Sequence, residues 1–494
     1  METVSPTMSA RKDPLYEQVA SEFRRKIDLG VLRAGEKLPS VRALRTGRRV
    51  STATVMEAYL RLERDGYVRV RDRSGFYVVH PPRQAILQPS TGRAITAPLP
   101  VGISALVADV LTQIGNHKLA QLGVSTLDPA LLPNARLNRA FRRVLARWPL
   151  HSAQYSSLSG VAGLRRQIAR RALALGTAID AEEVIVTAGG LEALNLALRA
   201  VASPGDVVAV ESPTYFGVLQ ALEAVGLRAL EIPADARAGI DLGLLEQTLK
   251  RHRVKAVLAM TTCHNPLGVV MSDTAKKDLV ALTARYGVPL VEDGVYADLA
   301  FDERSRRPAK AFDQKGLVIF CGSFSKVLAP GLRLGWIEAG RFSDRIRAYK
   351  GVTSGMTSAL PQLAVAELLA TRYYDRHVKR LRLRAGEQTR LYAKALRDVL
   401  PPGVRMTSPA GGSLLWVQLP GVDGTRVYRS LLQQGVGVFP GEIFSLRGKH
   451  RSFLRISCGA IWSPAIERAI GLLGKVVADA RTTLAPGRTN GVNS

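Results

Sequence analysis

Residues Gly322-Ser-Phe-Ser-Lys-Val-Leu-Ala-Pro-Gly-Leu-Arg-Leu-Gly-Trp336 decide the fold of this 494-residue chain. Two hydroxyls, those of Ser323 and Ser325, come just before Lys326, and Arg333 follows seven residues after the lysine. The apolar run immediately upstream predicts a buried strand. A lysine can form a Schiff base with an aldehyde, while hydroxyls and a guanidinium hold a phosphate. The spacing therefore favours a pyridoxal phosphate (PLP) site over an exposed basic loop.

Working outward from this stretch, short apolar segments alternate with helical ones from about residue 119. Strands are predicted at Val184–Thr187, Val207–Val210, Val254–Met260, Val288–Glu292 and Leu317–Cys321. This alternation is typical of an α/β domain with a largely parallel sheet, whose functional residues lie at the carboxyl ends of the strands. After residue 350, helical segments surround Leu414–Leu419 and Phe453–Ser457, which predicts a smaller α+β subdomain.

Polar residues follow several of these strands. Gly189 and Gly190 open a predicted helix whose free amides would bind phosphate, although a simple strand-to-helix turn is the alternative. Asn265 is placed to donate to a phenolate oxygen, which Tyr296 would share. Asp293 would keep a pyridine nitrogen protonated and so make the ring an electron sink. An aspartate at a strand end is also a common helix cap, so each residue alone is ambiguous.

Two further side chains complete the expected site. Tyr215 would stack on a flat heteroaromatic ring, with ordinary core packing as the alternative. Arg455 lies in the apolar segment Phe453–Ser457, and a buried arginine needs an anion. A ligand carboxylate held by both guanidinium nitrogens is one candidate, and an internal ion pair is the other. The set as a whole favours a PLP pocket.

The first 80 residues have a different pattern. An amphipathic helix is predicted at 15–28, a short one at 40–45, and a third that Ser51 caps. Two β-rich runs, 67–70 and 76–79, predict a hairpin. Three helices and a hairpin predict a winged helix-turn-helix, with a small protein-interaction module as the alternative. Its third helix would enter the major groove of DNA and its basic residues would lie near phosphates.

This N-terminal part resembles the GntR family in the segments Pro14–Gln18, Gly35–Arg42, Thr54–Tyr59, Gly66-Tyr67 and Ser74–Phe76. The resemblance implies a set of DNA-contacting residues: Ser40, Arg42, Ser51, Thr52, Thr54, and Arg73 and Gly75 in the wing. The stretch Arg45–Arg49 departs from the family, which has small and aliphatic residues there. Either the second helix is shortened or Arg48 points outward.

The remainder, about 119–478, is similar to the fold-type I aminotransferases. The resemblance rests on Asn265, Asp293, Tyr296, Lys326, Arg333 and Arg455 in this order, with further matches at Gln154-Tyr155, Gly160, Gly163–Arg165, Gly435–Gly441 and Phe444. It implies that Lys326 forms the Schiff base and that Asp293 binds the pyridine nitrogen. Asn265 and Tyr296 would bind the phenolate oxygen, and Tyr215 would stack on the ring.

The same resemblance implies the remaining contacts. The phosphate would be bound by Gly189, Gly190, Ser323, Ser325 and Arg333. Arg455 would bind the α-carboxylate of an amino acid, and the segment Leu127–Pro133 is similar to the one that closes over the substrate. Tyr155 would reach the phosphate of the partner subunit, which implies a homodimer.

Composition limits the classes of function. The formal net charge is +28, with +7 in residues 1–83 and +21 in the rest, which favours polyanions unless it only reflects an arginine-rich composition. No uncharged apolar run reaches the ~18 residues of a membrane span. Cys263, Cys321 and Cys458 lack metal-binding spacing and are expected to be reduced thiols of a cytoplasmic protein. We expect no metal and no membrane association.

Together the two halves resemble the MocR-like subfamily of GntR regulators. We predict a winged helix-turn-helix at 11–80, a proline-rich linker at 81–118, and an aminotransferase-like domain at 119–480, its large part at about 150–350 and its small subdomain at about 351–480. The implied function is a transcription factor that binds promoter DNA and senses an amino acid or amine through Lys326. The alternatives are an active aminotransferase with an accessory DNA-binding domain, and a DNA-binding protein that uses PLP only structurally.

Overall fold

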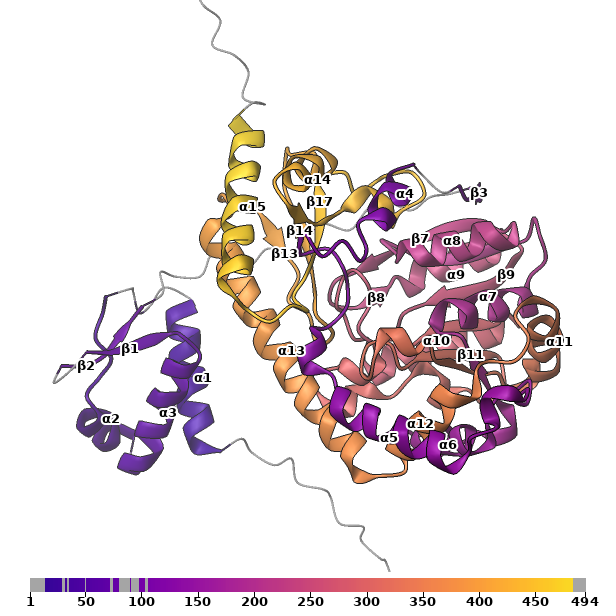
Figure 1. The fold of residues 1–494 in the computed structure, drawn as a ribbon. Coiled ribbons are helices and arrows are strands. Elements are labelled where there is room, and N and C mark those ends of the chain that lie inside the picture. Colours follow the sequence, from indigo (N-terminus) through magenta and orange to yellow (C-terminus); the bar gives the residue numbers. More distant parts are fainter. Residues whose placement is uncertain are drawn as a thin grey trace, which may run out of the picture. The chain divides into compact units, whose positions relative to one another are not determined.

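The computed structural model describes residues 14–28, 32, 35–48, 50–71, 74–79, 89, 97–102 and 105–482. The chain divides into two compact units, Met1–Leu87 and Gln88–Ser494, coloured along the sequence in Figure 1. No helix in the described part of the chain combines the length and apolar character needed to cross a membrane.

The first unit is a winged helix-turn-helix. Its elements are α1 (Leu15–Asp28), α2 (Val41–Arg48), α3 (Thr52–Arg64), β1 (Val68–Arg71) and β2 (Gly75–Val78). The strands pair antiparallel with Val68 opposite Val78. The core of this unit contains Phe23 of α1, Tyr59 of α3 and Phe76 of β2, which are all buried. The ring of Tyr59 contacts the other two rings edge to face. The predicted three-helix and hairpin arrangement is confirmed.

The atypical second helix keeps its full length. α2 continues through Arg48, whose exposed side chain forms an ion pair with Glu22 of α1. Leu44 is the residue by which α2 reaches the core. Of the two alternatives that the sequence left open, the outward-pointing arginine is therefore the observed one.

The second unit is built on a mixed nine-stranded sheet with the order β3-β7-β6-β9-β10-β11-β12-β5, with β8 added at β7. The strands are β3 (Leu99–Pro100), β5 (Val184–Thr187), β6 (Val207–Ser212), β7 (Arg228–Asp235), β8 (Gly239–Ile240), β9 (Val254–Ala259), β10 (Leu290–Asp293), β11 (Val318–Ser323) and β12 (Gly335–Glu338). The five central strands from β7 to β11 run parallel, and β12 is antiparallel to both its neighbours. The predicted α/β architecture is confirmed.

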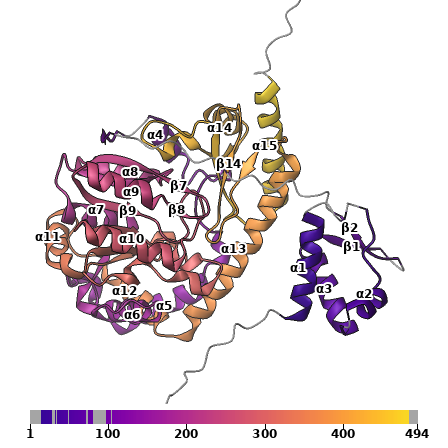
Figure 2. The ribbon, with the colours of Figure 1, turned by 180° about the vertical axis from the view of Figure 1, so that it is seen from behind.

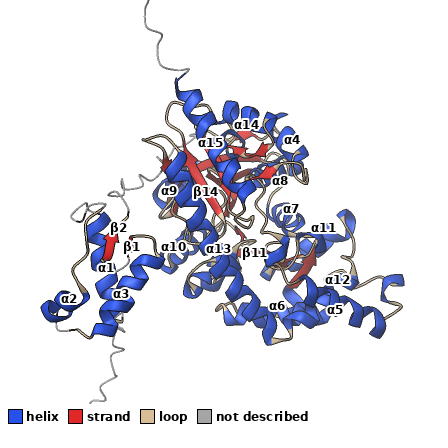
Figure 3. Ribbon diagram, turned by 60° about the vertical axis from the view of Figure 1, so that its left-hand side comes forward, coloured by secondary structure: helices blue, strands red, loops and turns tan. Residues whose placement is uncertain are grey.

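Helices cover both faces of this sheet, as Figures 2 and 3 show. The helices of this part are α5 (Asn134–Arg147), α6 (Ala162–Ala174), α7 (Gly190–Val201), α8 (Phe216–Val225), α9 (Leu242–Arg251), α10 (Asp273–Arg285), α11 (Ser343–Thr353) and α12 (Ala359–Leu369). Val208 and Val210 point to the core under α7 and α8, whereas Ala209 between them points to the core under α9 and α10. This alternation explains why β6 is apolar on both faces.

A smaller α+β part follows the sheet. Its elements are α13 (Arg372–Val399), β13 (Arg405–Met406), β14 (Leu414–Gln418), α14 (Gly424–Gln433), β15 (Val436–Gly437), β16 (Phe439–Pro440), β17 (Phe453–Ser457) and α15 (Pro464–Thr482). β14 lies between β13 and β17, and all pairings in this four-stranded sheet are antiparallel. The upstream elements α4 (Ala105–Thr112) and β4 (Ala120–Gln121) belong here spatially, because β4 pairs with β15.

Short 3-10 helices complete the connections: η1 (Pro129–Leu131), η2 (His151–Ala153), η3 (Ala181–Glu183), η4 (Ala297–Leu299), η5 (Glu303–Arg306), η6 (Ala309–Phe312), η7 (Pro330–Leu332), η8 (Gly340–Phe342) and η9 (Gly441–Phe444). Two of them matter for the site. η4 follows directly after Tyr296, and η7 ends at Arg333, so both side chains are held at ends of ordered turns.

Candidate functional site

Three predicted site residues lie at one edge of the sheet. β9, β10 and β11 are parallel neighbours, so their carboxyl ends meet. Asp293 is the last residue of β10, Lys326 follows β11, and Asn265 lies in the loop after β9. Parallel sheets place ligands at this edge because helix N-termini and loops converge there.

Lys326 and Tyr296 share an acceptor from an upstream segment. The Nζ atom of Lys326 donates to the carbonyl oxygen of Ser125 at 2.8 Å, and the Tyr296 hydroxyl donates to the same oxygen at 3.3 Å. The Nζ atom also lies 5.1 Å from the centre of the Tyr296 ring. The segment Gly123–Ser125, which we call the strap, therefore crosses the mouth of the site.

Asp293 is a buried carboxyl with a perturbed proton affinity. Its side chain is 1% exposed and accepts the Val295 amide at 3.2 Å. Burial raises the pKa of Asp293 to about 6, although Lys326 opposes the shift. Such a carboxyl gains from a cationic partner, which a protonated pyridine nitrogen provides.

A buried acid and a buried imidazole lie near Asp293, and the sequence did not single them out. Glu211 accepts the Met260 amide at 2.7 Å, and the Nε2 atom of His264 lies 3.2 Å from the same carboxylate oxygen. Both side chains are almost completely buried. The sequence did offer one signal for this pair: Glu211 follows an apolar strand, and a buried acidic residue needs internal hydrogen-bond or ion-pair partners.

The predicted phosphate cup is assembled at the start of α7. The Nη2 atom of Arg333 donates to the carbonyl of Ala188 at 3.2 Å, and the Ser323 hydroxyl accepts the Ser325 amide at 3.1 Å. Gly189 has φ of 100°, and a Cβ there would lie 2.7 Å from Arg333. Gly190 begins the helix, whose first amides have no intrahelical acceptor. Free amides, hydroxyls and a guanidinium are the donors by which proteins hold a phosphate.

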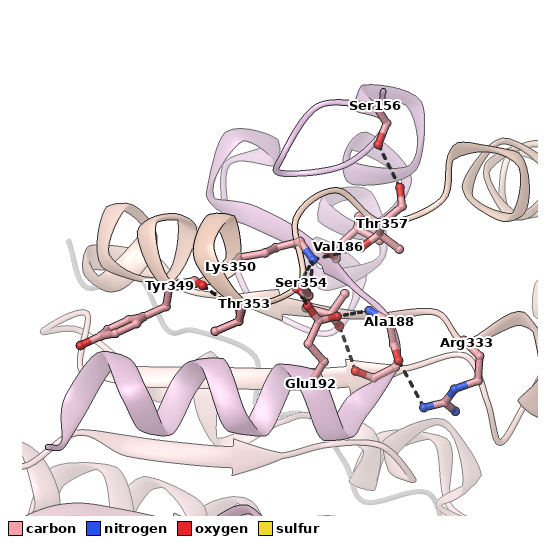
Figure 4. Close-up of polar contacts among 12 residues, drawn as sticks. Ser156, Val186, Ala188, Glu192, Arg333, Tyr349, Lys350, Thr353, Ser354 and Thr357 are labelled. Atoms are coloured by element: carbon pink, nitrogen blue, oxygen red, sulfur yellow. Dashed lines mark hydrogen bonds and ion pairs between the residues drawn. The ribbon is translucent and has the colours of Figure 1, made fainter. Parts of the chain in front are cut away.

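A polar network connects Ala188, whose carbonyl accepts from Arg333, to Glu192 and Lys350 (Figure 4). The carboxylate of Glu192 accepts the Ala188 amide, the Ser354 hydroxyl and, at 2.9 Å, the ammonium of Lys350. Lys350 is 1% exposed and also donates to the Thr357 hydroxyl at 3.1 Å. The network fixes the loop before α7 to the end of α11, and nothing in the sequence pattern indicated it.

Arg455 is fully buried in β17. It donates to the Asn265 side-chain oxygen at 3.0 Å and to the Gly123 carbonyl at 2.5 Å. Its guanidinium lies over the rings of Phe439 and Phe444, at 4.7 and 5.1 Å. Burial lowers the pKa of Arg455 to about 10. No carboxylate among the described residues pairs with it, and its Nε atom has no partner there.

Two tyrosines differ in exposure. Tyr215 is half-buried just before α8, beside the ring of Phe216. Tyr155 is 90% exposed and is not part of the cup of its own subunit. No group of three or more His, Cys, Asp or Glu side chains in the described ranges is arranged for a metal, and the three cysteines are buried and unpaired.

In the winged unit, two predicted residues cap helices. Ser51 accepts the Thr54 amide at 3.0 Å, and Ser40 accepts the Ala43 amide at 3.1 Å. Of the other three predicted helix residues, Arg42 and Thr52 are exposed. Thr54 is partly buried, and its hydroxyl lies 2.8 Å from that of Ser51.

The wing has a tight turn. Gly75 has φ of 104°, a conformation that favours glycine. Arg71 stacks on Tyr77 at 4.6 Å, and Lys37, which the sequence did not single out, lies 5.9 Å from the centre of the same ring. Arg73 lies outside the described residues.

Each unit of the chain matches a known family. Residues 15–78 match the bacterial regulatory proteins of the gntR family, and residues 139–472 match aminotransferase class I and II. The multiple substrate aminotransferase of Thermococcus profundus has a TM-score of 0.72 at 27% identity, over 78% of this chain and 97% of that one. LysN of Thermus thermophilus, an alpha-aminoadipate aminotransferase complexed with N-(5′-phosphopyridoxyl)-L-leucine, has a TM-score of 0.70 at 28% identity, over 77% and 96%. The second unit is a fold-type I PLP-binding domain.

The whole chain also has full-length relatives. The HTH-type transcriptional regulator YdcR of Escherichia coli (strain K12) is 37% identical over 94% of this chain and 98% of its own length. The chain belongs to the MocR-like subfamily of GntR regulators, in which a winged helix-turn-helix is fused to an aminotransferase class I and II domain.

Proposed function

We propose that the protein is a PLP-dependent transcriptional regulator that binds promoter DNA and senses an amino acid or amine through a covalent bond formed at Lys326. One observation carries the proposal: a winged helix-turn-helix and an aminotransferase fold that brings Lys326 beside Tyr296 and buries Asp293 occur in one chain. We assign residues 11–80 to DNA binding and 119–480 to the sensor. Within the predicted linker, 81–118, β3 and α4 already belong to the second unit. Because it would act on DNA, we expect the protein in the cytoplasm.

When bound, PLP supplies an aldehyde for an amine and an electron-withdrawing ring. Asp293 would pair with the pyridine nitrogen, because its buried carboxylate forms no ion pair among the described residues. The Asn265 oxygen already accepts from Arg455, so its amide N–H groups would be left to donate to the phenolate oxygen, beside the Tyr296 hydroxyl. Tyr215 would cover one face of the ring.

The phosphate would lie in the cup. The donors would be the amides of Gly189 and Gly190, the hydroxyls of Ser323 and Ser325, and the guanidinium of Arg333. The exposed Tyr155 would reach the cup of a second subunit, so the cup would be complete only in a homodimer. This assignment is supported by the 90% exposure of an aromatic side chain.

Arg455 would bind the carboxylate of an amino-acid ligand. Its Nη2 atom now donates to the Gly123 carbonyl of the strap. A bidentate carboxylate would replace that carbonyl as the acceptor of Arg455. An amine that takes the place of Lys326 at the aldehyde would free the lysine, which would then donate to Ser125 as it does here. Loss of the Gly123 contact would loosen the strap. Ligand binding would therefore alter the segment that β4 and α4 connect to the linker and the DNA-binding unit.

On DNA, α3 would lie in the major groove with Thr52 and Thr54 near base edges. Ser40 and Arg42 on α2, and Ser51 at the start of α3, would contact phosphates. Arg73 and Gly75 of the wing would lie along the neighbouring backbone. Exposure of Arg42 and Thr52 supports this placement.

A second candidate function is transamination, which the similarity of the second unit to aminotransferases supports. Two assays separate the functions. Candidate amino acids are added while the visible cofactor band and keto-acid release are followed, and binding to DNA upstream of the gene is measured with and without PLP. A regulator shows specific DNA binding that ligand changes. Rapid multiple turnover without specific DNA binding would disprove regulation.

A further inference from the structure

One surface of the second unit is strongly basic. α5 has no acidic residue, and its exposed side carries the arginines Arg136, Arg139, Arg142, Arg143 and Arg147. Its apolar side, with Leu137 and Val144, packs against α12. Figure 1 shows α5 at the edge of the unit, beside α12 and the first part of α13.

Next to α5 is a hollow of about 220 Å³ that we call the arginine hollow. Its basic lining residues are Arg136, Arg139, Arg143, Arg372 and Arg376. Its one carboxylate, Glu367, is bound by Arg143 at 2.9 Å. Arg139, Arg372 and Arg376 form no ion pair with any residue in the described ranges. The hollow thus has several positive charges without a neutralising partner.

Two further features of the arginine hollow favour the binding of an anion. The guanidinium of Arg136 lies 5.1 Å from the centre of the Tyr373 ring, a stacking that leaves its N–H edge available. α13 begins at Arg372, and its capping residue, Thr371, gives no side-chain hydrogen bond to the first amides. A helix N-terminus adds a partial positive charge and free donors.

The dimensions fit a polyanion. At about 1.5 Å rise per residue, Arg136 and Arg147 are about 16 Å apart along α5. One strand of DNA carries a phosphate about every 3.4 Å along the helix axis, so several phosphates fit this length. A docking site for a protein would have an apolar centre, whereas this lining is dominated by guanidinium groups.

We propose that the arginine hollow and the exposed side of α5 form a second DNA-binding surface, which contacts the phosphodiester backbone without reading sequence. The inference rests on the proposed DNA-binding function and goes beyond it, because it assigns DNA contacts to the aminotransferase-like unit. It also gives the charge of +21 outside residues 1–83 a function. Both surfaces of the chain then contribute to the free energy of binding to long DNA.

The test measures the salt dependence of binding to a long duplex of unrelated sequence, with the full chain loaded with PLP. The variant removes the three unpaired charges: Arg139→Gln, Arg372→Gln and Arg376→Gln. Each lost phosphate contact lowers the slope of log K against log salt by about 0.9, so the triple variant loses up to about 2.7. A matched control neutralises three exposed arginines near α9: Arg237→Gln, Arg251→Gln and Arg253→Gln.

We expect the slope to fall for the hollow variant and to stay close to wild type for the control, with unchanged melting temperatures and cofactor absorbance. Equal changes in both variants would assign the effect to overall charge and overturn the proposal. No change in either would also overturn it. The variant Arg42→Gln distinguishes failure of this proposal from failure of the proposed function. If Arg42→Gln abolishes binding to the upstream DNA while the hollow variant keeps a wild-type slope, the proposal of a second surface is refuted and DNA binding by the winged unit stands.

Discussion

Replacing Arg455 by methionine tests the carboxylate site most directly. At about 1.4 kcal/mol per pKa unit, lowering the pKa of this buried guanidinium to about 10 corresponds to roughly 3 kcal/mol. The folded chain holds this proton less firmly than the unfolded one. The cost is therefore fully present at neutral pH and disappears only as the pH rises above about 10.

In the ligand-free protein, the substitution has opposing effects. Arg455→Met removes the charged-group cost but also removes the hydrogen bonds to Asn265 and Gly123, each of which contributes about 1.5–3 kcal/mol because its donor is charged. We expect a melting temperature equal to or moderately below that of the wild type. The folded variant therefore tests ligand binding.

The effect of Arg455→Met on ligand affinity should be large for ligands that carry a carboxylate. Removing one partner of a buried hydrogen-bonded charge pair costs about 2–5 kcal/mol. The dissociation constant of an amino acid should thus rise by about 30-fold to several thousand-fold. The amine that lacks the carboxylate should bind wild type and variant equally. Both are measured by titrating the visible absorbance of the PLP-loaded protein.

The control is Arg451→Gln, which removes an exposed arginine paired with Glu442 in the same subdomain and should leave both affinities unchanged. An amino-acid affinity that survives Arg455→Met would refute the assignment of the carboxylate to Arg455. Equal losses for the amino acid and the amine would show that Arg455 only maintains the shape of the site.

Substitutions at four other positions test single contacts. Lys326→Ala should eliminate the visible band of the bound cofactor, and a surviving band would place the covalent bond elsewhere. PLP affinity should fall as the pH drops below about 6, because Asp293 then becomes protonated, and Asp293→Asn should remove this pH dependence in equilibrium titrations. Gly189→Ala adds strain of about 1–3 kcal/mol and a clash with Arg333, so PLP affinity should drop about tenfold or more; unchanged affinity would exclude this loop from the cup. Ser51→Ala removes a helix cap that contributes about 1 kcal/mol, which should lower the melting temperature of the N-terminal unit but not PLP affinity. A cofactor-affinity change there would contradict our separation of the two sites.

The sequence predicted the edge of the sheet well because strand ends have a strong pattern. Apolar runs placed Asp293 and Lys326 just after neighbouring parallel strands, and parallelism alone then brought them together. Hydrophobic periodicity also predicted the three helices and the hairpin of the first unit. These features follow from local pattern plus the rule that parallel strands end at one edge.

The contacts that the sequence missed involve backbone atoms or distant partners. The acceptor of Lys326 is the carbonyl of Ser125, and every residue type supplies a carbonyl, so no pattern marks it. The Glu192–Lys350 pair joins residues far apart in the chain. The position of Arg48 was undecided because its partner Glu22 lies in another helix.

The strap suggests how one ligand can act on DNA binding. It lies between the linker side of the chain and the cofactor side, and its two carbonyls accept from Lys326 and Arg455. A ligand changes an equilibrium only as far as it binds the two states differently. An amino acid would satisfy this condition, because its carboxylate would compete with Gly123 for Arg455 while its amine replaces Lys326 at the aldehyde of PLP. A simple amine lacks the carboxylate and leaves the contact between Arg455 and Gly123 in place, so it should change DNA binding less than an amino acid of equal affinity.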